Sequence, residues 1–249
     1  MPHIKVDNWL RHIQGWILPP RCVVCGCAGR PPVQDLCRHC EREFVRNAAA
    51  CRGCALPAES PGRELCGRCL RHARGFDTAF APFRYEYPLD RLLQRFKYQG
   101  QLALGRVLGS LLTEAVIARH IELPQALVPV PLARGKQRER GFNQAYELAR
   151  APARALKLPI RTDLCARTRA TRDQATLRAR DRRRNVVGAF VATEAALPRH
   201  VAVVDDVLTT GSTCEELARV LKRAGAERVD VWVIARAAPP GPSSPEITL

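Results

Sequence analysis

The spacing of apolar residues changes near residue 75, and the change divides the chain into parts of different kinds. Between residues 76 and 236, short apolar runs alternate with longer segments in which apolar residues recur every three or four positions. Short apolar runs predict buried strands, and the recurrence predicts helices. Alternating strands and helices are typical of a mostly parallel sheet with helices on both faces. We therefore expect an α/β fold for residues 76–236.

The individual runs give the expected elements. Strands are predicted at residues 80–87, 126–130, 200–204 and 228–235. Helices are predicted from Pro88 onward, over residues 102–118, near residues 143–156 and over residues 213–224. Pro88 fits a helix start because the missing N–H of proline has no partner to lose in the first turn.

The two ends of the chain differ from this central part. An amphipathic helix is expected near the N-terminus, with an apolar face made of Trp9, Leu10, Ile13, Trp16 and Ile17. This segment lacks the apolar stretch of a signal peptide, and no run reaches the ~20 apolar residues that span a membrane. We expect a cytoplasmic protein without membrane insertion. The Pro-, Gly- and Ser-rich residues 237–249 are predicted to form a flexible tail.

Eight of the eleven cysteines form four pairs with the spacing C-x-x-C. The pairs are Cys22 with Cys25, Cys37 with Cys40, Cys51 with Cys54, and Cys66 with Cys69. Each of the first four cysteines has a counterpart 29 residues later, and Asp35-Leu36 before one pair is mirrored by Glu64-Leu65 before another. The segment is therefore an internal duplication of one unit, C-x2-C-x11-C-x2-C.

This spacing predicts zinc binding. Two thiolates separated by two residues bind one metal ion from a tight turn, and two such turns complete the tetrahedral shell that zinc prefers. Disulfides are the competing interpretation, but they require an oxidising compartment. One zinc per repeat, as in tandem zinc ribbons, is simpler than a cross-braced arrangement, which the spacing alone leaves open. Metal binding should be coupled to folding, because the segment has few large apolar residues.

Three cysteines stand outside the pairs. Cys27 is either a bystander thiol or an alternative zinc ligand, and we favour the bystander. Cys165 and Cys214 are expected to be buried thiols rather than nucleophiles, because neither has a nearby histidine in the sequence to activate it.

A phosphate-binding segment is predicted where the strand at residues 200–204 ends. Asp205 and Asp206 follow the strand, and the loop of Thr209, Thr210 and Gly211 leads into a helix. The sheets of α/β proteins bind ligands at the carboxyl ends of their strands. Backbone N–H groups, hydroxyls and a helix N-terminus together bind a phosphate. Two carboxylates would repel an anion unless they contact hydroxyls, so a ribose 5-phosphate suits both ends of the segment.

This segment resembles the motif that binds 5-phosphoribosyl-1-pyrophosphate (PRPP) in type I phosphoribosyltransferases. The resemblance implies that Asp205 and Asp206 hold the 2- and 3-hydroxyls of the ribose and that the loop and helix start hold the 5-phosphate. The full PRPP-binding segment would comprise Asp205, Asp206, Val207, Leu208, Thr209, Thr210, Gly211, Ser212 and Thr213. An active transferase would also use Mg²⁺ to neutralise the leaving pyrophosphate.

The net charge of +16 is concentrated in one part of the chain. Residues 134–184 hold sixteen Arg and Lys against five Asp and Glu, which gives this stretch a charge of +11. Such asymmetry favours phosphorylated small molecules or nucleic acid as partners. A solvated, arginine-rich surface is the alternative, and composition alone does not separate the two.

Further runs resemble the ComF competence family, which includes GntX-type proteins. These runs are residues 127–132 (LVPVPL), 138–144 (RERGFNQ), 167–177 and 184–185, and Phe96-Lys97-Tyr98, together with the double cysteine unit. The resemblance covers nearly the whole chain. It implies a double zinc-ribbon domain at residues 1–75, followed by a type I phosphoribosyltransferase domain at residues 76–236.

The family also implies roles within the basic stretch. Its pyrophosphate loop would lie at residues 132–136, which include Leu132, Ala133 and Arg134, and its flexible catalytic loop near residues 167–184. The arginines expected to contact the pyrophosphate are Arg134, Arg138, Arg140, Arg167 and Arg169.

The resemblance implies a protein that handles incoming single-stranded DNA in natural transformation, with partners in the DNA-uptake machinery. Three functions stay open at this point: a phosphoribosyltransferase with an unknown acceptor, a non-catalytic PRPP sensor, and a single-stranded-DNA-binding protein on the same fold. The fold does not decide among them, since one fold hosts many functions.

Overall fold

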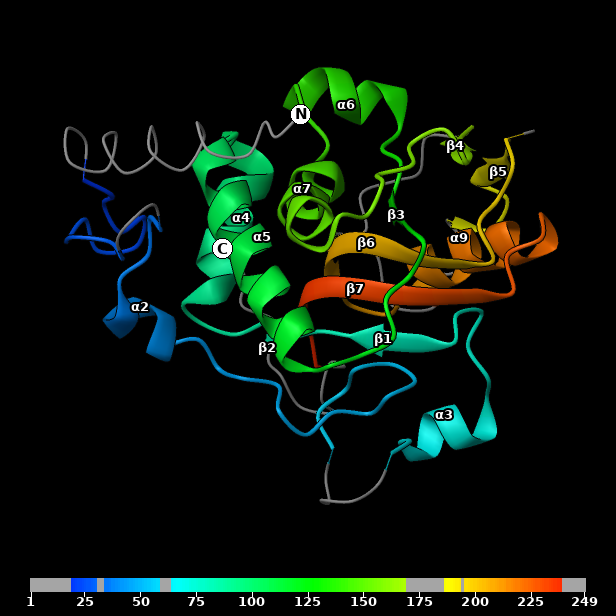
Figure 1. The fold of residues 1–249 in the computed structure, drawn as a ribbon, viewed down its shortest axis with the longest axis horizontal. Helices are drawn as coiled ribbons and strands as arrows, with labels where there is room; N and C mark the ends of the chain where they lie inside the picture. Colours follow the sequence, from blue (N-terminus) through cyan, green and yellow to red (C-terminus); the bar gives the residue numbers. More distant parts are fainter. Residues whose placement is uncertain (1–18, 31–33, 59–63, 169–185, 194, 239–249) are drawn as a thin grey trace, which may run out of the picture.

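A parallel sheet forms the centre of the molecule (Figure 1). The computed structural model describes residues 19–30, 34–58, 64–168, 186–193 and 195–238. The sheet has the strand order β1, β7, β6, β3, with β2 also pairing with β7, and each of these pairings is parallel. Its strands are β1 (Thr78–Phe80), β2 (Phe83–Arg84), β3 (Ala126–Pro129), β6 (His200–Leu208) and β7 (Arg228–Arg236).

Strand β6 is buried on both faces over its first five residues. Its register places Val203 beside Val128 of β3 and Val231 of β7. Successive side chains of a strand point to opposite faces of the sheet. Val203 accordingly packs in one buried cluster and Val204 in the other.

Helices cover both faces of the sheet, as the alternating pattern predicts. The cluster that contains Val204 includes α4 (Leu89–Gln99), α5 (Leu102–Ala118) and α7 (Gln144–Leu156), which lie together in Figure 1. The cluster that contains Val203 includes α9 (Ser212–Arg223). The α/β class is confirmed, and the arrangement is consistent with the type I phosphoribosyltransferase fold.

Three smaller elements surround the loops at the end of β3 and β6. The short helix α6 (Arg134–Arg140) follows β3, and β4 (Cys165–Arg167) pairs antiparallel with β5 (Phe190–Ala192). Asn143 then starts α7, because its Oδ1 accepts hydrogen bonds from the backbone N–H groups of Ala145 and Tyr146.

Some predicted bounds are wrong. The strand expected at residues 80–87 is two short strands, β1 and β2, because the chain leaves the sheet at Ala81 and Pro82 between them. The strand expected at residues 200–204 continues to Leu208, so that both aspartates lie inside β6 rather than after it. Residues 134–136, expected in a loop, form the first turn of α6.

Two cysteine-rich units precede the sheet and repeat the same structure; we call them ribbon 1 (residues 20–43) and ribbon 2 (residues 49–72). A β-bridge occupies the same position in both, between Arg21 and Ala28 in ribbon 1 and between Ala50 and Pro57 in ribbon 2. Each also holds one short helix, α2 (Arg38–Arg42) or α3 (Gly67–Arg71). Corresponding positions are 29 residues apart throughout, so the duplication extends from the cysteines to the backbone.

The two ribbons contact different parts of the sheet domain. Ribbon 1 contributes Leu36 to the buried cluster with α4 and α5. Ribbon 2 contributes Ala55 to the cluster with α9, and its Arg52 carbonyl accepts a hydrogen bond from the N–H of Ala79 in β1.

No helix in the described part of the chain is long and apolar enough to cross a membrane. The amphipathic segment with Trp9 and Ile17, the expected tail after residue 238 and most of the expected flexible loop lie outside the described residues.

Candidate functional site

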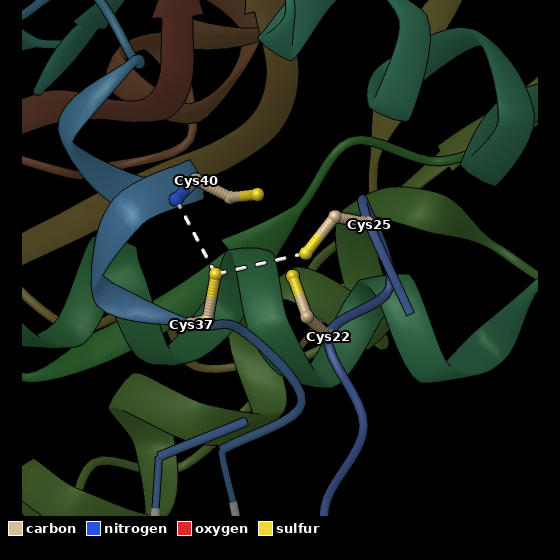
Figure 2. Close-up of side chains that lie close together, drawn as sticks. All are labelled: Cys22, Cys25, Cys37 and Cys40. Carbon is tan, nitrogen blue, oxygen red and sulfur yellow. Dashed lines mark hydrogen bonds between the residues drawn. The ribbon is translucent and has the colours of Figure 1, made fainter. Parts of the chain in front are cut away.

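Four cysteine sulfurs converge in each ribbon. The sulfurs of Cys22, Cys25, Cys37 and Cys40 lie within 4.8 Å of one another, as do those of Cys51, Cys54, Cys66 and Cys69. Figure 2 shows the first set pointing toward a common centre. The Sγ atoms of Cys25 and Cys37 are 3.8 Å apart, and those of Cys54 and Cys66 are 3.7 Å apart. Four sulfurs at about 2.3 Å from a tetrahedral zinc ion would be about 3.8 Å apart, so both sets fit zinc.

The backbone of each ribbon explains why the cysteines converge. The first C-x-x-C turn closes with a residue of positive φ, Gly26 in ribbon 1 and Ala55 in ribbon 2. The second pair starts a helix in both ribbons, with Cys37 or Cys66 as the residue just before its first turn. The metal-ligand sets therefore come from consecutive pairs and not from a cross-brace, and Cys27 belongs to neither set.

Hydrogen bonds favour thiolate at one cysteine of each set. Burial raises the pKa of Cys22, but backbone hydrogen bonds from Cys37, Cys25 and Val24 outweigh it and lower this pKa to about 6. Burial likewise opposes the charge of Cys66, whose pKa is lowered to about 7, chiefly by the backbone of Cys69. Since zinc binds thiolates, these groups are suited to metal binding near neutral pH.

Asp205 and Asp206 lie near the carboxyl end of β6. Asp205 Oδ1 accepts a hydrogen bond from the N–H of Asp206 at 2.9 Å, and Asp206 Oδ1 accepts one from the N–H of Val207 at 2.7 Å. Asp206 is only 6% exposed, so its carboxylate is largely shielded from solvent. Cys214, a buried thiol as predicted, lies 4.0 Å from Asp205 Oδ2.

Lys97 of α4 provides the positive charge that pairs with these carboxylates. Its Nζ lies 3.4 Å from Asp206 Oδ2, and Asp206 raises the pKa of Lys97. Burial, together with the charge of Asp206, raises the pKa of Asp205 to about 7, although Lys97 and Arg167 oppose that shift. Burial and the neighbouring carboxylate thus favour the neutral form of Asp205.

The predicted phosphate loop follows β6 directly. Leu208 ends the strand, and Gly211 adopts a φ of +81° immediately before α9. Gly211 has no side chain with which to cap α9. The hydroxyl oxygen of Thr210 lies 2.9 Å from that of Ser212 and accepts a hydrogen bond from the N–H of Ser212 at 3.3 Å. Hydroxyls and a helix N-terminus of this kind can bind an anion.

Among the arginines predicted to contact pyrophosphate, Arg140 and Arg167 lie near the acid pair or its lysine. The guanidinium of Arg140 lies 5.3 Å from the ring centre of Tyr98, beside Lys97. Arg167 stacks on Phe190 at 5.3 Å, and its charge acts on Asp205. Arg138 is exposed on α6.

The remaining residues of the predicted pyrophosphate site lie at the start of α6 or outside the described residues. Leu132 and Ala133 form the extended segment that leads into α6, and Arg134 is its first residue. Arg169 lies outside the described residues.

Three basic residues contact either the acid pair or the loop, and the sequence analysis assigned a role to none of them. Lys97 belongs to a run noticed only for its resemblance. Arg74 and Arg236 contact the loop from positions 136 and 27 residues away and belong to no motif.

The zinc geometry generates the first prediction. We expect the purified protein to hold two zinc ions per chain. Cys37→Ser or Cys66→Ser should each remove one zinc and lower the thermal unfolding temperature, because an incomplete shell loses binding free energy that folds the ribbon. Cys27→Ser is the control and should keep both ions. Metal analysis of the three variants checks this, and one zinc or none in the unmodified protein would contradict it.

The raised pKa of Asp205 generates the second prediction, which concerns the dependence of folding stability on pH. Its proton is held up to about pH 7 in the folded chain but is lost near pH 4 in the unfolded chain. The unfolded state thus binds fewer protons between these values, so ionisation of Asp205 lowers the free energy of unfolding as pH rises. Asp205→Asn should remove this effect. The stability gained by the variant should grow by roughly 2–3 kcal/mol between pH 5 and pH 8 in denaturant titrations. A gain that is independent of pH would refute the assignment.

Known proteins resemble this chain over nearly its full length. A family model described as a double zinc ribbon domain matches residues 13–70. Competence protein F of Haemophilus influenzae is 35% identical over 224 residues, 87% of this chain and 97% of that protein. The DNA utilization protein YhgH of Escherichia coli K12 is 36% identical over 223 residues, 88% of this chain and 98% of that protein. Competence protein ComFC of Streptococcus pneumoniae is 25% identical over 202 residues, 81% of this chain and 87% of that protein. Because identity near 35% extends over almost the whole of both chains, this protein belongs to the ComF (competence protein F) family.

Proposed function

We propose that this protein binds PRPP at the carboxyl edge of its sheet and handles single-stranded DNA during DNA uptake. The observation that carries the first part is the continuous segment from Asp205 to Thr213. Within nine residues it joins two adjacent carboxylates to a hydroxyl-rich loop and a helix N-terminus. A sugar diol bearing a phosphate is complementary to both halves.

Charge balance supports this ligand. Two ionised carboxylates would repel the phosphates of PRPP. Lys97 neutralises Asp206 through the 3.4 Å contact, and the raised pKa of Asp205 lowers the negative charge of the pair. The free protein can then admit an anion, while Asp205 and Asp206 accept hydrogen bonds from the ribose hydroxyls.

The pyrophosphate would lie toward α6 and β4. Arg140 and Arg167 come from these elements, and the electrostatic influence of each reaches the acid pair or its lysine. The carboxylate oxygens of Asp205 and Asp206 are hard donors of the type that Mg²⁺ prefers. Asp205 and Asp206 would hold such an ion, which would supply positive charge to the pyrophosphate leaving group. The arginines would bind that leaving group and exclude water.

Two versions of this function differ in turnover. A transferase would pass the ribosyl group from PRPP to an acceptor and release pyrophosphate, whereas a sensor would bind PRPP and release none. Pyrophosphate release, measured with PRPP and Mg²⁺ against nucleobases, amines and DNA, distinguishes the two versions.

Replacing both carboxylates should abolish PRPP binding. Hydrogen bonds to charged groups are worth about 1.5–3 kcal/mol each, so Asp205→Asn with Asp206→Asn should weaken binding by roughly 100-fold or more. Calorimetry with Mg²⁺ measures this, and thermal unfolding verifies the fold because Asp206 is buried. Asp163→Asn, which alters an exposed carboxylate paired with Arg161, is the control. Unchanged affinity in the double variant would overturn the ribose assignment.

The DNA part of the proposal is supported by relatives and by charge. The relatives carry the names competence protein F and DNA utilization protein. Residues 134–184 have a charge of +11, more than one small ligand requires. Tyr98, which is 58% exposed, adds an aromatic face beside Arg140. Basic side chains that contact phosphates and aromatic rings that stack on bases are the usual combination for single-stranded DNA.

Tyr98→Ala should therefore weaken binding of an oligo-dT probe. Stacking contributes about 1–3 kcal/mol per base, which corresponds to roughly 5-fold to 150-fold in affinity. Tyr87→Ala is the matched control, because this tyrosine is 75% exposed but precedes the opposite end of α4. Fluorescence anisotropy measures both variants. Equal losses, or none, would contradict a stacking role for Tyr98.

Salt and competition separate DNA binding from PRPP binding. Arg138→Glu with Arg140→Glu should flatten the dependence of affinity on salt, by about 0.7 in log-log slope for each phosphate that the variant no longer neutralises. Asp205→Asn should leave DNA binding nearly unchanged. Full displacement of the oligonucleotide by saturating PRPP would instead indicate one shared site.

A further inference from the structure

Arg236 links ribbon 2 to the phosphate loop. It ends β7 and is 2% exposed. Its Nε donates a hydrogen bond to the carbonyl oxygen of Cys54 at 2.8 Å. Its Nη1 donates to the carbonyl oxygens of Leu208 at 2.6 Å and Thr209 at 2.5 Å. Because Cys54 belongs to the second ligand set, one buried guanidinium contacts both the metal-binding turn and the loop.

Arg74 forms a second link to the next residue of the same loop. Its side chain is 8% exposed and follows ribbon 2 directly. Nη1 donates to the carbonyl oxygen of Thr210 at 3.3 Å and lies 3.5 Å from Glu215 of α9. The same guanidinium interacts electrostatically with the side chain of Cys69, another member of the second ligand set.

Backbone packing adds a third contact at this junction. A Cβ on Gly75 would lie 2.6 Å from the carbonyl oxygen of Glu215 in the first turn of α9. The chain that leaves ribbon 2 thus passes against the helix whose N-terminus faces the predicted phosphate. The carbonyl oxygens of three consecutive residues, 208–210, accept hydrogen bonds from two arginines that both contact ribbon 2.

Charge explains why this junction should depend on the metal. A zinc ion with four thiolates has a net charge of −2, and two guanidiniums adjacent to it have a charge of +2. Loss of zinc removes the bonds that hold the four sulfurs together and opens the shell. The arginines would then lose the anionic group that holds them, and the loop carbonyls would lose fixed donors.

Ribbon 1 has the same geometry but other neighbours. Val23 accepts a hydrogen bond from Arg95 of α4, and Gln34 donates one to Glu114 of α5. Its contacts therefore lead to the helices on the opposite face of the sheet from α9.

We propose that ribbon 2 positions the phosphate loop through Arg74 and Arg236, so that zinc in the second site is required for anion binding at residues 208–213. Arg74 and Arg236 are positioning residues, since each acts on the loop through backbone carbonyls. Zinc in the first site supports α4 and α5 and leaves the loop unchanged. The identity of the anion rests on the proposed function, but the positioning of the loop does not.

The test compares equivalent cysteines in the two ribbons. Cys37 and Cys66 are 29 residues apart, are similarly exposed and each precede a ribbon helix. Both Cys37→Ser and Cys66→Ser should lose one zinc. Hydrogen exchange followed by mass spectrometry should show at least tenfold faster exchange for amides of residues 208–214 in Cys66→Ser only. PRPP affinity measured by calorimetry with Mg²⁺ should fall by at least tenfold in Cys66→Ser. Equal exchange in the two variants would overturn the proposal.

Arg74→Lys covers the case in which Cys66→Ser does not fold. It keeps the charge and all eight ligand cysteines, so two zinc ions should remain, but an ammonium cannot maintain the contacts of a guanidinium to both Thr210 and Glu215. Exchange at residues 208–214 should still rise, whereas Arg95→Lys, the control beside ribbon 1, should leave it unchanged. Unaltered exchange in Arg74→Lys would refute the link. Faster exchange without any PRPP binding, even in the unmodified protein, would reject PRPP as the ligand while retaining the positioning role.

Discussion

The parallel pairing of β6 with β3 and β7 determines where every part of the site lies. A strand between two neighbours and beneath helices on both faces has no place for polar side chains until it reaches the edge of the sheet. The first five residues of β6 are accordingly buried, and the carboxylates follow at Asp205 and Asp206. The loop and α9 come next because the chain must turn there. The pairing thus delivers acid groups, hydroxyls and a helix N-terminus to one edge.

Two carboxylates lie within β6, near its carboxyl end, and placing them there costs free energy. Each would lose hydration there, and each repels the other. Backbone N–H donors and Lys97 of α4 offset part of these costs. The raised pKa of Asp205 offsets another part, because the neutral form of this carboxyl is favoured. Under the proposed function, each of these compensations would be reversible on ligand binding, since ribose hydroxyls and Mg²⁺ would replace what the lysine and the proton provide. The acid pair would therefore keep contacts that a ligand can replace, at some cost to the stability of the fold.

Local sequence predicted the parts of the site that come from one continuous segment. The cysteine pairs, the acid pair and the loop each have a fixed spacing that reflects one turn or one strand end. The length of β6 was underestimated because Asp205 and Asp206 are poor strand formers, and pairing with β7 overrides that preference. The sequence analysis did not predict helix α6, because its sequence, RGKQRER, has no apolar residues that could recur at helical spacing. Lys97, Arg74 and Arg236 reach the site only through tertiary contacts, which no local pattern records.

The left-handed residue after each first cysteine pair shows how far the two ribbons have diverged. Gly26 adopts this conformation freely, whereas Ala55 does so at a cost of about 1 kcal/mol. In return, the Ala55 methyl packs in the core beneath β1, and its carbonyl accepts a hydrogen bond from buried Asn47. Descendants of one duplicated unit have thus become specialised, one copy retaining the relaxed turn and the other adapting its turn to a neighbour. A chain rebuilt from two copies of ribbon 1 would keep eight ligand cysteines but would lack this methyl group beneath the sheet.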